Sequence, residues 1–541
     1  MEKTETTQSA TTTEKRMGSA HRVFRGDMIK VYPSRAANAS LVFLLVLSVD
    51  FSETNMLNTN HGAARPGFIG STWLLAGCLA VLLAGRADGK QWQIGKDSEL
   101  KTALKVVAAG DAIVLADGDW KDAKLTFEQL PGTNEAPIVI RPQHPGGVVF
   151  SGATEFRVSG THVNVTGFVF RDPDGVSDVV QLRTHSQRLA HHCRVTQCWF
   201  EQTGDSDAGI ESRWLSIYGT NNRVDHCYFG GKKNQGTTLV VWVSEVAEHH
   251  RIDHNHFGPR PELGRNGGET IRIGTSEVSE LECASVVEDN YFYRCDGEAE
   301  IVSNKSCGNI YRHNVFDSCA GALTLRHGHR CLVDGNIFLG RQQRGTGGVR
   351  LIGQDHRVTN NYFEGLRGDA ERAALCMMNG IPNGALNSYA PVRGTVVAHN
   401  TFIDCKASME IGMGAGKKQS ANPSDCQFVG NIFMPMKWQL FRIHAEPQDF
   451  VWQGNLQQVG GDDRDSFMQF PRVELSLQRA ADGLLRPSDA GLLRCDVPDI
   501  VKNDLDNFSR GANSVAGCDD PATAHRVWPS AENTGPTWRP R

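Results

Sequence analysis

The chain has 541 residues, 40% of them hydrophobic, which is enough for one large domain or two ordinary ones. Its formal net charge of −5 excludes a basic field over the whole surface, so nucleic acid is not expected as a partner and any other polyanion must be held by a local basic cluster. None of the 14 cysteines forms a CxxC pair, which argues against a zinc ribbon or a thioredoxin-type redox site.

The N-terminal part, residues 1–87, is expected to be an extension followed by a signal peptide. Residues 1–20 are polar and rich in Thr, Ser and Glu, which is typical of disorder. Residues 73–84 are apolar over the length of a signal-peptide core, and the small residues Gly85 and Ala87 predict cleavage after Ala87. The mature chain is then expected to lack a stable membrane span and to be secreted or periplasmic.

Two further features of this end leave alternatives open. Met56 would give a signal peptide of conventional length, so residues 1–55 are expected to be an over-extended start. Cys78 ends a Leu-Ala-Gly-Cys segment that resembles a lipoprotein cleavage box. The apolar run continues past Cys78, which makes a lipid anchor there less favoured, and an uncleaved signal anchor is the other alternative.

Residues 97–107 predict a short capped helix before the first strand, at residues 112–115. Leu100, Ala103 and Val107 fall on one face of this helix, whereas charged residues occupy the opposite face. We expect the helix to cover the N-terminal edge of the fold that follows.

The middle of the chain repeats a strand-like unit, V-x-x-N-x-F, in which an Asn or Cys stands two residues before a Phe. Most units span roughly 22 to 35 residues and alternate as strands do, which indicates a solenoid. We predict an all-β fold, a right-handed parallel β-helix whose Asn residues form an amide ladder at a bend. A β-propeller is the competing repeat fold, but its blades need about 40 residues. The Phe residues of the units are Phe200, Phe229, Phe257, Phe292, Phe316, Phe338, Phe363, Phe402 and Phe433.

The cysteines at positions 295, 307, 319 and 331 recur every twelve residues. We therefore predict two columns of small buried residues, one joining Cys295 to Cys319 and one joining Cys307 to Cys331. After about residue 456 the repeat is lost. The β-helix domain is thus expected to occupy residues 88–541, with an irregular last segment that covers the C-terminal end or runs back along the side.

One short stretch of the sequence carries most of the candidate chemistry. Glu298 and Glu300 are at i and i+2, so on a strand they point to the same face. With the side-chain oxygen of Asn266 they would suit a hard cation such as Ca²⁺, which takes oxygen ligands. Lys305 is a plausible base for removing a proton next to a carboxylate, because a bound cation stabilises the charge that develops. The alternative is a surface network in which the two glutamates pair with arginines.

Three segments, residues 266–274, 298–306 and 323–328, together resemble the signature segments of polysaccharide lyase family 6. That family contains chondroitinase B and many alginate lyases. The resemblance runs from about Gln91 to Trp538, nearly the whole mature chain. It implies a β-helix enzyme that acts on an anionic polysaccharide.

The resemblance also implies roles for individual residues. Asn266, Glu298 and Glu300 match the family's Ca²⁺ ligands, and Lys305 matches the base that takes the proton at C5 of the sugar. Arg326 matches the other catalytic residue, often described as the acid that protonates the leaving O4. A guanidinium is a poor proton donor, so Arg326 is alternatively expected to stabilise charge while water or a tyrosine supplies the proton.

Residues for substrate binding follow from position along the coils. Arg326 follows Lys305 by slightly less than one coil, which predicts that the two lie side by side, and Arg350 is predicted to extend that column by one coil. We expect Arg350 and His327 to bind substrate carboxylate or hydroxyl groups, as matching family positions suggest. Arg272 is assigned to substrate binding as well, supported by an ion pair with Glu269.

The expected function is that of an exported polysaccharide lyase, a monomer or simple dimer that cleaves a polyuronate by Ca²⁺-assisted β-elimination. Alginate is the favoured substrate, because most of the family resembles alginate lyases, and dermatan sulfate is the second. Two alternatives stay open at this point. One is an enzyme like a mannuronan C5-epimerase, which returns the proton to the opposite face, and the other is a non-catalytic β-helix that binds glycans.

Overall fold

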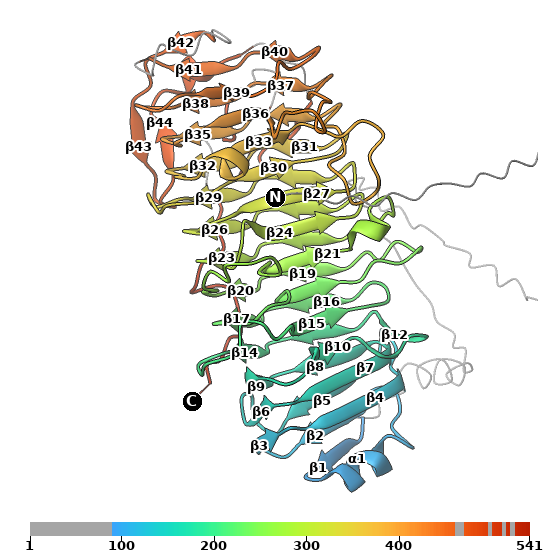
Figure 1. Ribbon diagram of the computed structural model, residues 1–541. Helices are drawn as coiled ribbons and strands as arrows, with labels where there is room; N and C mark the ends of the chain where they lie inside the picture. The colour runs from blue at the N-terminus through green and yellow to red at the C-terminus, as the bar shows by residue number, and fades with distance from the viewer. Residues whose placement is uncertain (1–88, 460–469, 496–499, 511–514, 520–524, 541) are drawn as a thin grey trace, which may run out of the picture. The chain divides into compact units, whose positions relative to one another are not determined.

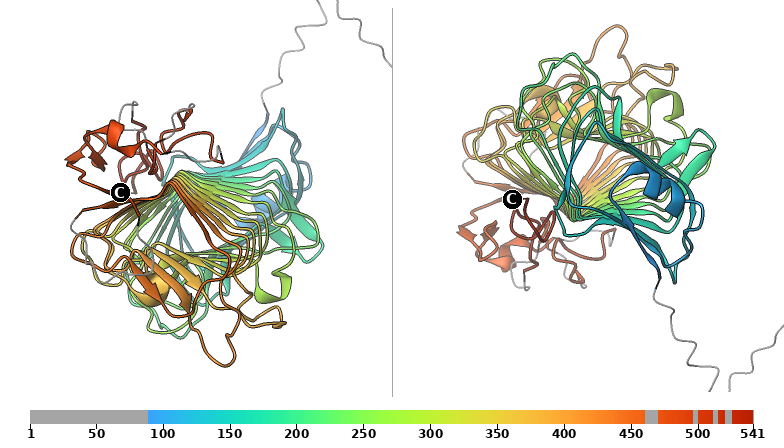
Figure 2. Two further views of the ribbon diagram at one scale, coloured as in Figure 1. Left: turned by 90° about the horizontal axis from the view of Figure 1, so that it is seen from above. Right: turned by 90° about the horizontal axis from the view of Figure 1, so that it is seen from below.

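The computed structural model describes residues 89–459, 470–495, 500–510, 515–519 and 525–540. The expectations for the signal peptide, its cleavage after Ala87 and Cys78 lie outside these residues. The described part of the chain confirms the predicted parallel β-helix, with three long sheets of 14 strands each (Figure 1). Seen from either end, the three sheets enclose a common interior (Figure 2). No helix in the described ranges is both long and apolar enough to cross a membrane.

Sheet A contains one strand from every coil, and all of its pairings are parallel. In β5, for example, buried and half-buried positions alternate, because every second side chain points into the interior. The strands of sheet A are β1 (Gln91–Ile94), β2 (Ala112–Leu115), β5 (Ile138–Pro142), β8 (Val163–Thr166), β13 (Arg194–Thr196), β16 (Arg223–Asp225), β19 (Arg251–Asp253), β22 (Val286–Glu288), β25 (Ile310–Arg312), β28 (Leu332–Asp334), β31 (Arg357–Thr359), β34 (Val396–Ala398), β37 (Gln427–Val429) and β40 (Val451–Gln453).

Sheet B follows sheet A after a tight bend in most coils, and its strands carry the repeated Phe. The strands of sheet B are β3 (Gly118–Lys121), β6 (Val148–Gly152), β9 (Val169–Pro173), β14 (Trp199–Glu201), β17 (Tyr228–Gly230), β20 (His256–Phe257), β23 (Tyr291–Tyr293), β26 (Val315–Asp317), β29 (Ile337–Leu339), β32 (Tyr362–Glu364), β35 (Thr401–Ile403), β38 (Ile432–Met434), β41 (Leu456–Gln458) and β42 (Arg472–Val473).

Sheet C carries the candidate site and the longest strands of the later coils. Its strands are β4 (Lys124–Pro131), β7 (Glu155–Thr161), β10 (Asp178–Gln181), β11 (Arg183–His185), β12 (Arg188–His191), β15 (Arg213–Ile217), β18 (Leu239–Val241), β21 (Ile271–Ile273), β24 (Glu300–Lys305), β27 (Ala322–His327), β30 (Val349–Leu351), β33 (Leu375–Met378), β36 (Met409–Met413) and β39 (Phe441–Ile443). Strands β11 and β12 form an antiparallel hairpin that leaves the regular coil. Short 3₁₀ helices follow or precede strands of this sheet at Ser276–Val278 and Ala370–Arg372.

Stacked identical side chains hold the interior together, as the repeat predicted. From Phe170 to Phe433 one Phe per coil stacks on the next, with ring centroids 4.5 to 5.2 Å apart. This spacing matches the separation of neighbouring strands, so each coil adds one ring at the favoured distance. The register of one coil on the next is therefore set by its Phe.

The predicted amide ladder is also present, at the bend between sheets A and B. Each Asn donates from Nδ2 to Oδ1 of the Asn one coil further on, over distances of 2.8 to 3.0 Å. The same Oδ1 accepts a backbone N–H, so the buried amides satisfy one another. The ladder contains Asn255, Asn290, Asn314, Asn336, Asn361, Asn400, Asn431 and Asn455.

The cysteine prediction is half correct. Cys295 and Cys319 are stacked on adjacent coils, with the backbone N–H of Cys295 donating to Sγ of Cys319 at 3.4 Å. The predicted column of Cys307 and Cys331 is wrong, because Ile310 pairs with Leu332 and this register puts Cys331 beside Asn309. The two sequence intervals are equal, but loops of different length shift the positions within each coil. Twelve of the described cysteines, all except Cys495, are buried free thiols.

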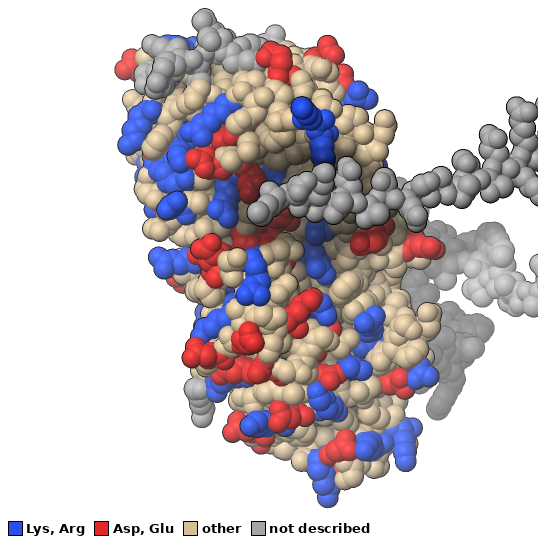
Figure 3. Space-filling view, in the orientation of Figure 1, with Lys and Arg blue, Asp and Glu red and all other residues tan. Residues whose placement is uncertain are grey.

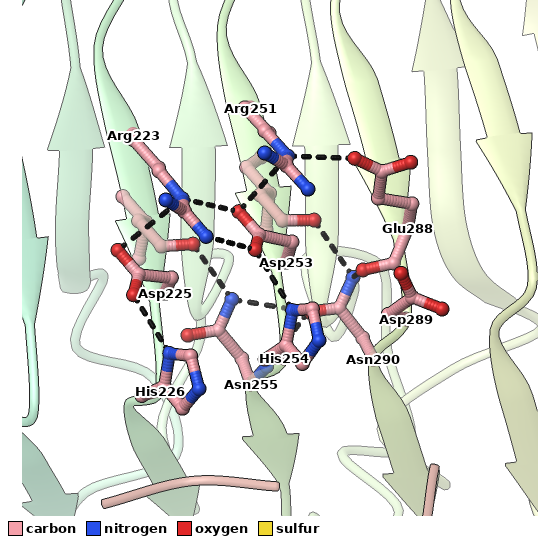
Figure 4. Close-up of polar contacts among 12 residues, drawn as sticks. Arg223, Asp225, His226, Arg251, Asp253, His254, Asn255, Glu288, Asp289 and Asn290 are labelled. Carbon is pink, nitrogen blue, oxygen red and sulfur yellow. Dashed lines mark hydrogen bonds and ion pairs between the residues drawn. The ribbon is translucent and has the colours of Figure 1, made fainter. Parts of the chain in front are cut away.

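The outer face of sheet A carries a ladder of alternating charge (Figure 4). Arg223 pairs with Asp253 at 2.6 Å, and Arg251 pairs with Glu288 at the same distance on the next coils. At the adjoining bend, His254 Nδ1 lies 2.8 Å from an oxygen of Asp253. The histidines of this bend, such as His226 and His254, adopt left-handed backbone angles.

Both ends of the β-helix are covered. Helix α1, Asp97–Ala103, covers the first coil as predicted and buries Leu100 and Ala103, but it ends four residues before the predicted end at residue 107. At the other end, β42 adds a last strand to sheet B, and β43 (Leu477–Arg479) and β44 (Leu485–Pro487) form a hairpin. A 3₁₀ helix follows at Ala490–Leu493.

The irregular C-terminal residues combine the two alternatives that the sequence left open. Strand β42 covers the last coil, and the segment beyond it runs back along the side of the β-helix (Figures 1 and 2). Leu484 and Leu505 are buried with Ile337 and Ile432 of sheet B. Further along, the backbone N–H of Thr537 donates to the side chain of Gln197, 2.8 Å away. This segment therefore ties coils together that are far apart in the sequence.

Candidate active site

The candidate site lies on sheet C, where β24 pairs with β27 and β27 pairs with β30. Hydrogen bonds of buried side chains hold the end of β24 in place below the site. Asn304 is buried and donates from Nδ2 to the backbone oxygens of Ser306 and His327, at 2.9 and 2.8 Å. Tyr311 donates its hydroxyl to Asn304 Oδ1 at 2.7 Å. These bonds fix the end of β24, and with it the direction of Lys305.

Lys305 and Arg326 are neighbours on adjacent coils, but the predicted column with Arg350 is wrong. The pairing of β24 with β27 shifts between Asn304 and Lys305, so that Lys305 faces His327 and Arg326 is the additional residue of the bulge. Arg350 is in register with Thr324, two residues before Arg326. It therefore extends the column that begins at Arg272 and passes through Ser303 and Thr324.

Two arginines and a tyrosine gather beside Lys305. The Arg326 guanidinium lies over the ring of Tyr389, 4.2 Å from its centroid. Arg350, which is only 6% exposed, donates from Nη2 to the Tyr389 hydroxyl at 3.1 Å. Among the described residues, Lys305 has no hydrogen bond or ion pair to its Nζ, although the side chain is half-buried. The amine is thus available to a ligand.

His327 is held neutral in this setting. Burial, together with the charges of Arg326 and Lys305, lowers the pKa of His327 to about 3. Nδ1 lies 3.4 Å from Arg326 Nη1 and can only accept from it, so Nε2 carries the proton and donates to the Ser276 hydroxyl at 3.1 Å. The ring therefore orients Arg326.

The acidic half of the site is built by Glu298 and Glu300. Glu298 accepts backbone N–H groups from Gly267 and Gly268, at 3.0 and 3.3 Å, which draws it next to Asn266. Glu300 accepts from Ser303 Oγ at 2.5 Å and lies 3.5 Å from Nη1 of Arg350. Both carboxylates thus sit between the 266–268 segment and the arginines.

The donor set fits a calcium ion. Burial, and after it the neighbouring carboxylates of Glu269 and Glu300, raises the pKa of Glu298 to about 7. Glu269 is 3% exposed, and its Oε2 has no hydrogen-bond partner. A cation with oxygen ligands would relieve both features. Asn266 is exposed and supplies the amide oxygen of the predicted set.

Arg272 lies one strand away, on β21, and the predicted ion pair with Glu269 is not among those of the described residues. Its guanidinium instead lies 5.4 Å from the ring centroid of Trp242. Arg272 Nε is buried without a hydrogen-bond partner. The residue therefore remains a candidate for anion binding, through a different support from the one expected.

Two hollows flank the site. One of about 600 Å³ is lined by Glu298, Arg265, Arg344 and Arg372, before the strands of sheet C. The other, of about 190 Å³, is lined by His327 and Tyr389 at the opposite strand ends. Over the face seen in Figure 3, basic and acidic side chains are mixed, so local clusters rather than one basic field face an anionic ligand.

Comparison with known proteins decides the family. Residues 94–449, more than half of the chain, match the family model described as Chondroitinase B. The chain belongs to the chondroitinase B family of polysaccharide lyases, family 6. No match was found among curated proteins.

Solved structures of family 6 lyases share the fold. The alginate lyase AlyGC is 33% identical with a TM-score of 0.74, over 83% of this chain and 59% of that one. The chain thus spans 59% of the length of AlyGC. A mannuronic acid specific lyase from human gut microbiota is 31% identical with a TM-score of 0.63, over 72% of this chain and 92% of its own. The family 6 lyase Pedsa3628 from Pseudopedobacter saltans is 20% identical, with a TM-score of 0.63 over 83% and 99%, and shares the fold alone.

Most of the residues that the sequence nominated lie close to one another on and beside sheet C, namely Glu298, Glu300, Lys305, Arg326, His327 and Arg350. Arg272 lies one strand away beside Trp242, and no contact of the Asn266 side chain is found among the described residues. Sequence reasoning missed Tyr389 as a named residue. It lies in the loop between β33 and β34, which belongs to no repeat and matches none of the three resembling segments. Only a general expectation that a tyrosine supplies the proton pointed toward it.

Proposed function

We propose that the protein is a polysaccharide lyase that cleaves a polyuronate, with alginate as the first substrate, by β-elimination. The observation that carries this proposal is the amine of Lys305, which has no partner among the described residues and lies one strand from Arg326. Arg326 in turn lies over Tyr389, whose hydroxyl contacts Arg350. A base and a charge-stabilising group on adjacent coils suit an elimination whose two bonds lie on neighbouring carbons of one sugar.

The reaction requires that one proton leave carbon and one reach oxygen. Lys305, as the neutral amine, takes the proton from C5, and the electron pair of that bond forms the C4–C5 double bond as the C4–O4 bond breaks. Arg326 and Arg350 offer N–H groups to the substrate carboxylate, where negative charge builds up. The departing O4 takes a proton from the Tyr389 hydroxyl or from water, because neither guanidinium is an effective acid.

A calcium ion held by Asn266, Glu298 and Glu300 would draw charge away from the substrate carboxylate and so stabilise the intermediate state. One of these carboxylates, Glu300, also lies near both arginines. Nε of Arg326 and Nη1 of Arg350 lie 3.9 and 3.5 Å from Glu300 Oε1. Glu300 therefore links the acidic and basic halves of the site with or without an ion.

Alginate is preferred over dermatan sulfate on the strength of the relatives. The two structures above 30% identity are described as an alginate lyase and a mannuronic acid specific lyase. Export of the protein, through the N-terminal segment discussed above, would bring it to such a polymer outside the cell.

The test measures ultraviolet absorbance of the unsaturated uronate, with the full chain on alginate and on dermatan sulfate in parallel, each with Ca²⁺ and with a chelator. A rise on alginate that is absent in Lys305→Ala supports the proposal. A rise in absorbance on dermatan sulfate alone would make dermatan sulfate, and not alginate, the substrate. Binding without any rise, combined with a change in the ratio of the two uronates, would support an epimerase, and binding without either change would support a glycan-binding module.

A further inference from the structure

A column of two aromatic rings between two arginines lies on sheet C, on the N-terminal side of the candidate site. The rings of Tyr218 and Trp242 are stacked, with centroids 5.8 Å apart and planes at 9°. The Arg183 guanidinium lies over Tyr218 at 3.8 Å, and that of Arg272 lies 5.4 Å from the Trp242 centroid.

The position of this column is fixed by the coil register. Tyr218 directly follows β15, and Trp242 directly follows β18. The last residues of these two strands, Ile217 and Val241, pair with each other. Val241 pairs in turn with Ile273, and Ile273 with Asn304, the residue before Lys305. The rings therefore occupy the same place on their coils as Lys305 does on its own. Gly274, between Trp242 and Lys305, puts no side chain in the way.

The arginines of the column are charged groups without carboxylate partners. Neither Arg183 nor Arg272 has an ion pair among the described residues, and Nε of Arg272 is buried without a hydrogen-bond partner. Asp178, the nearby buried carboxylate, is already bound by Arg213 at 2.9 Å. Arg213, which lies 5.6 Å from the Trp242 ring centroid, is paired with Asp178 and Glu211, so the unpaired positive charge of the column is that of Arg183 and Arg272.

Stacking on an aromatic ring leaves the hydrogen-bonding N–H groups of a guanidinium free. An arginine that lies on a ring uses its flat face for that contact, while its in-plane N–H groups point outward in the fork that fits a carboxylate. The rings also hold these long side chains in place, which reduces the entropy that binding would cost. Such a column suits a ligand with carboxylates at repeated intervals.

We propose that Arg183, Tyr218, Trp242 and Arg272 form a distal binding strip for a polyuronate chain, and that the strip makes the enzyme favour long substrates. This inference rests on the proposed function, since it names how the same site holds its polymer. Arg183 comes two residues after the end of β10, and β10 lies four strands from β24 in sheet C, about 19 Å at the spacing of neighbouring strands. A short oligosaccharide bound at Lys305 cannot reach it, whereas a long chain running along sheet C can.

The test compares Arg183→Gln with wild type on long alginate and on short oligosaccharides of the same uronates. We expect KM for the long chain to rise about tenfold more than KM for the short one, with kcat changed little on either. The matched control is Arg539→Gln, because Arg539 also lies over a tryptophan, at 5.3 Å from Trp199, but on sheet B. The control is expected to behave as wild type.

A second measurement separates this inference from the proposed function. Binding of long and short alginate to Lys305→Ala, with and without Arg183→Gln, needs no cleavage. Weaker binding of the long chain alone supports the strip even if wild type cleaves nothing. Equal KM values for Arg183→Gln and wild type, in an enzyme that does cleave alginate, would overturn the strip and leave the lyase standing. An equal loss on long and short substrates would also overturn it.

Discussion

Arg326 and Glu300, on adjacent strands of sheet C, face each other across the centre of the site, with Nε 3.9 Å from Oε1. The contact is too long for a strong hydrogen bond, and the Arg326 side chain is 18% exposed. Arg326 can therefore turn toward a substrate carboxylate without leaving a tightly bound partner. The same geometry lets Glu300 serve both the arginines and a cation.

The first prediction concerns the base. Lys305→Ala is expected to lower kcat on alginate by at least about 10³-fold, because the other titratable group on β24, Glu300, is assigned to the cation and contacts the arginines. Binding of the polymer is expected to fall much less. Lys305→Arg is the matched variant, since it keeps the charge and cannot act as a base, and it should be as inactive as Lys305→Ala. Activity of Lys305→Arg near that of wild type would contradict the assignment.

The second prediction concerns the tyrosine. Tyr389→Phe keeps the ring under Arg326 and removes only the hydroxyl that Arg350 contacts. We expect kcat to fall by about 10²-fold while KM changes little, as for the loss of a general acid. A loss confined to KM would show that Tyr389 only positions Arg350. The pH profile of kcat, compared between Tyr389→Phe and wild type, distinguishes a proton donor from a support.

The sequence predicted the parts of this fold that recur once per coil. Each Phe and each Asn stacks on the same residue type in the next coil. The position of these residues in the repeat therefore predicts both the fold and the register of its coils. The candidate base, Lys305, was predictable for a related reason, since it lies on a regular strand next to the two glutamates.

What the sequence could not give depends on irregular geometry. Arg350 pairs with Thr324, 26 residues earlier, and not with Arg326, 24 residues earlier, because this coil is longer than the predicted one. The shift of pairing between Asn304 and Lys305 also moves Arg326 out of register with Lys305. A bulge of one residue cannot be recognised from the spacing of residues along the sequence. Tyr389 comes from a loop without a repeat, so only the folded chain brings it to Arg326. The same holds for the C-terminal segment, whose contacts with early coils have no local signal.

The third prediction concerns calcium. If Asn266, Glu298 and Glu300 bind the ion, adding Ca²⁺ should raise the unfolding temperature, by a free energy of about 2.7 kcal/mol at one hundred times the dissociation constant. Glu298→Gln should abolish this shift. Glu262→Gln is the matched control, because Glu262 lines the same hollow as Glu298 and is exposed. A shift that survives in Glu298→Gln would place the ion elsewhere.

The fourth prediction concerns the amide ladder. Asn314→Ala removes the acceptor of Asn290 Nδ2 and the donor to Asn336 Oδ1, and leaves buried groups without partners. We expect the free energy of unfolding to fall by about 2 to 3 kcal/mol, measured by denaturant titration. Asn134→Ala, at an exposed position, is expected to change it by less than about 0.5 kcal/mol. Equal effects of the two would mean that the ladder adds no stability.

The fifth prediction concerns the charge ladder on sheet A. Burial raises the pKa of Asp225, but hydrogen bonds from Arg194 and His226 and the charges of Arg194 and Arg223 lower it by more, so the net pKa lies well below the usual value. A carboxyl group with a lowered folded pKa stabilises the protein above its unfolded value of about 4, and that stability is lost as the pH falls through the folded value.

The loss of this carboxylate should therefore depend on pH. At pH 7, Asp225→Asn is expected to lower the free energy of unfolding by about 3 kcal/mol, since it leaves buried partners of Asp225 uncompensated. Near pH 2 to 3 the difference in unfolding free energy from wild type should shrink, because protonation of Asp225 then removes part of the stability that its lowered pKa provides. Unfolding in denaturant across this range checks the prediction, with exposed Asp119→Asn as the control. A difference that stays constant from pH 7 to pH 2 would assign the effect to packing rather than to charge.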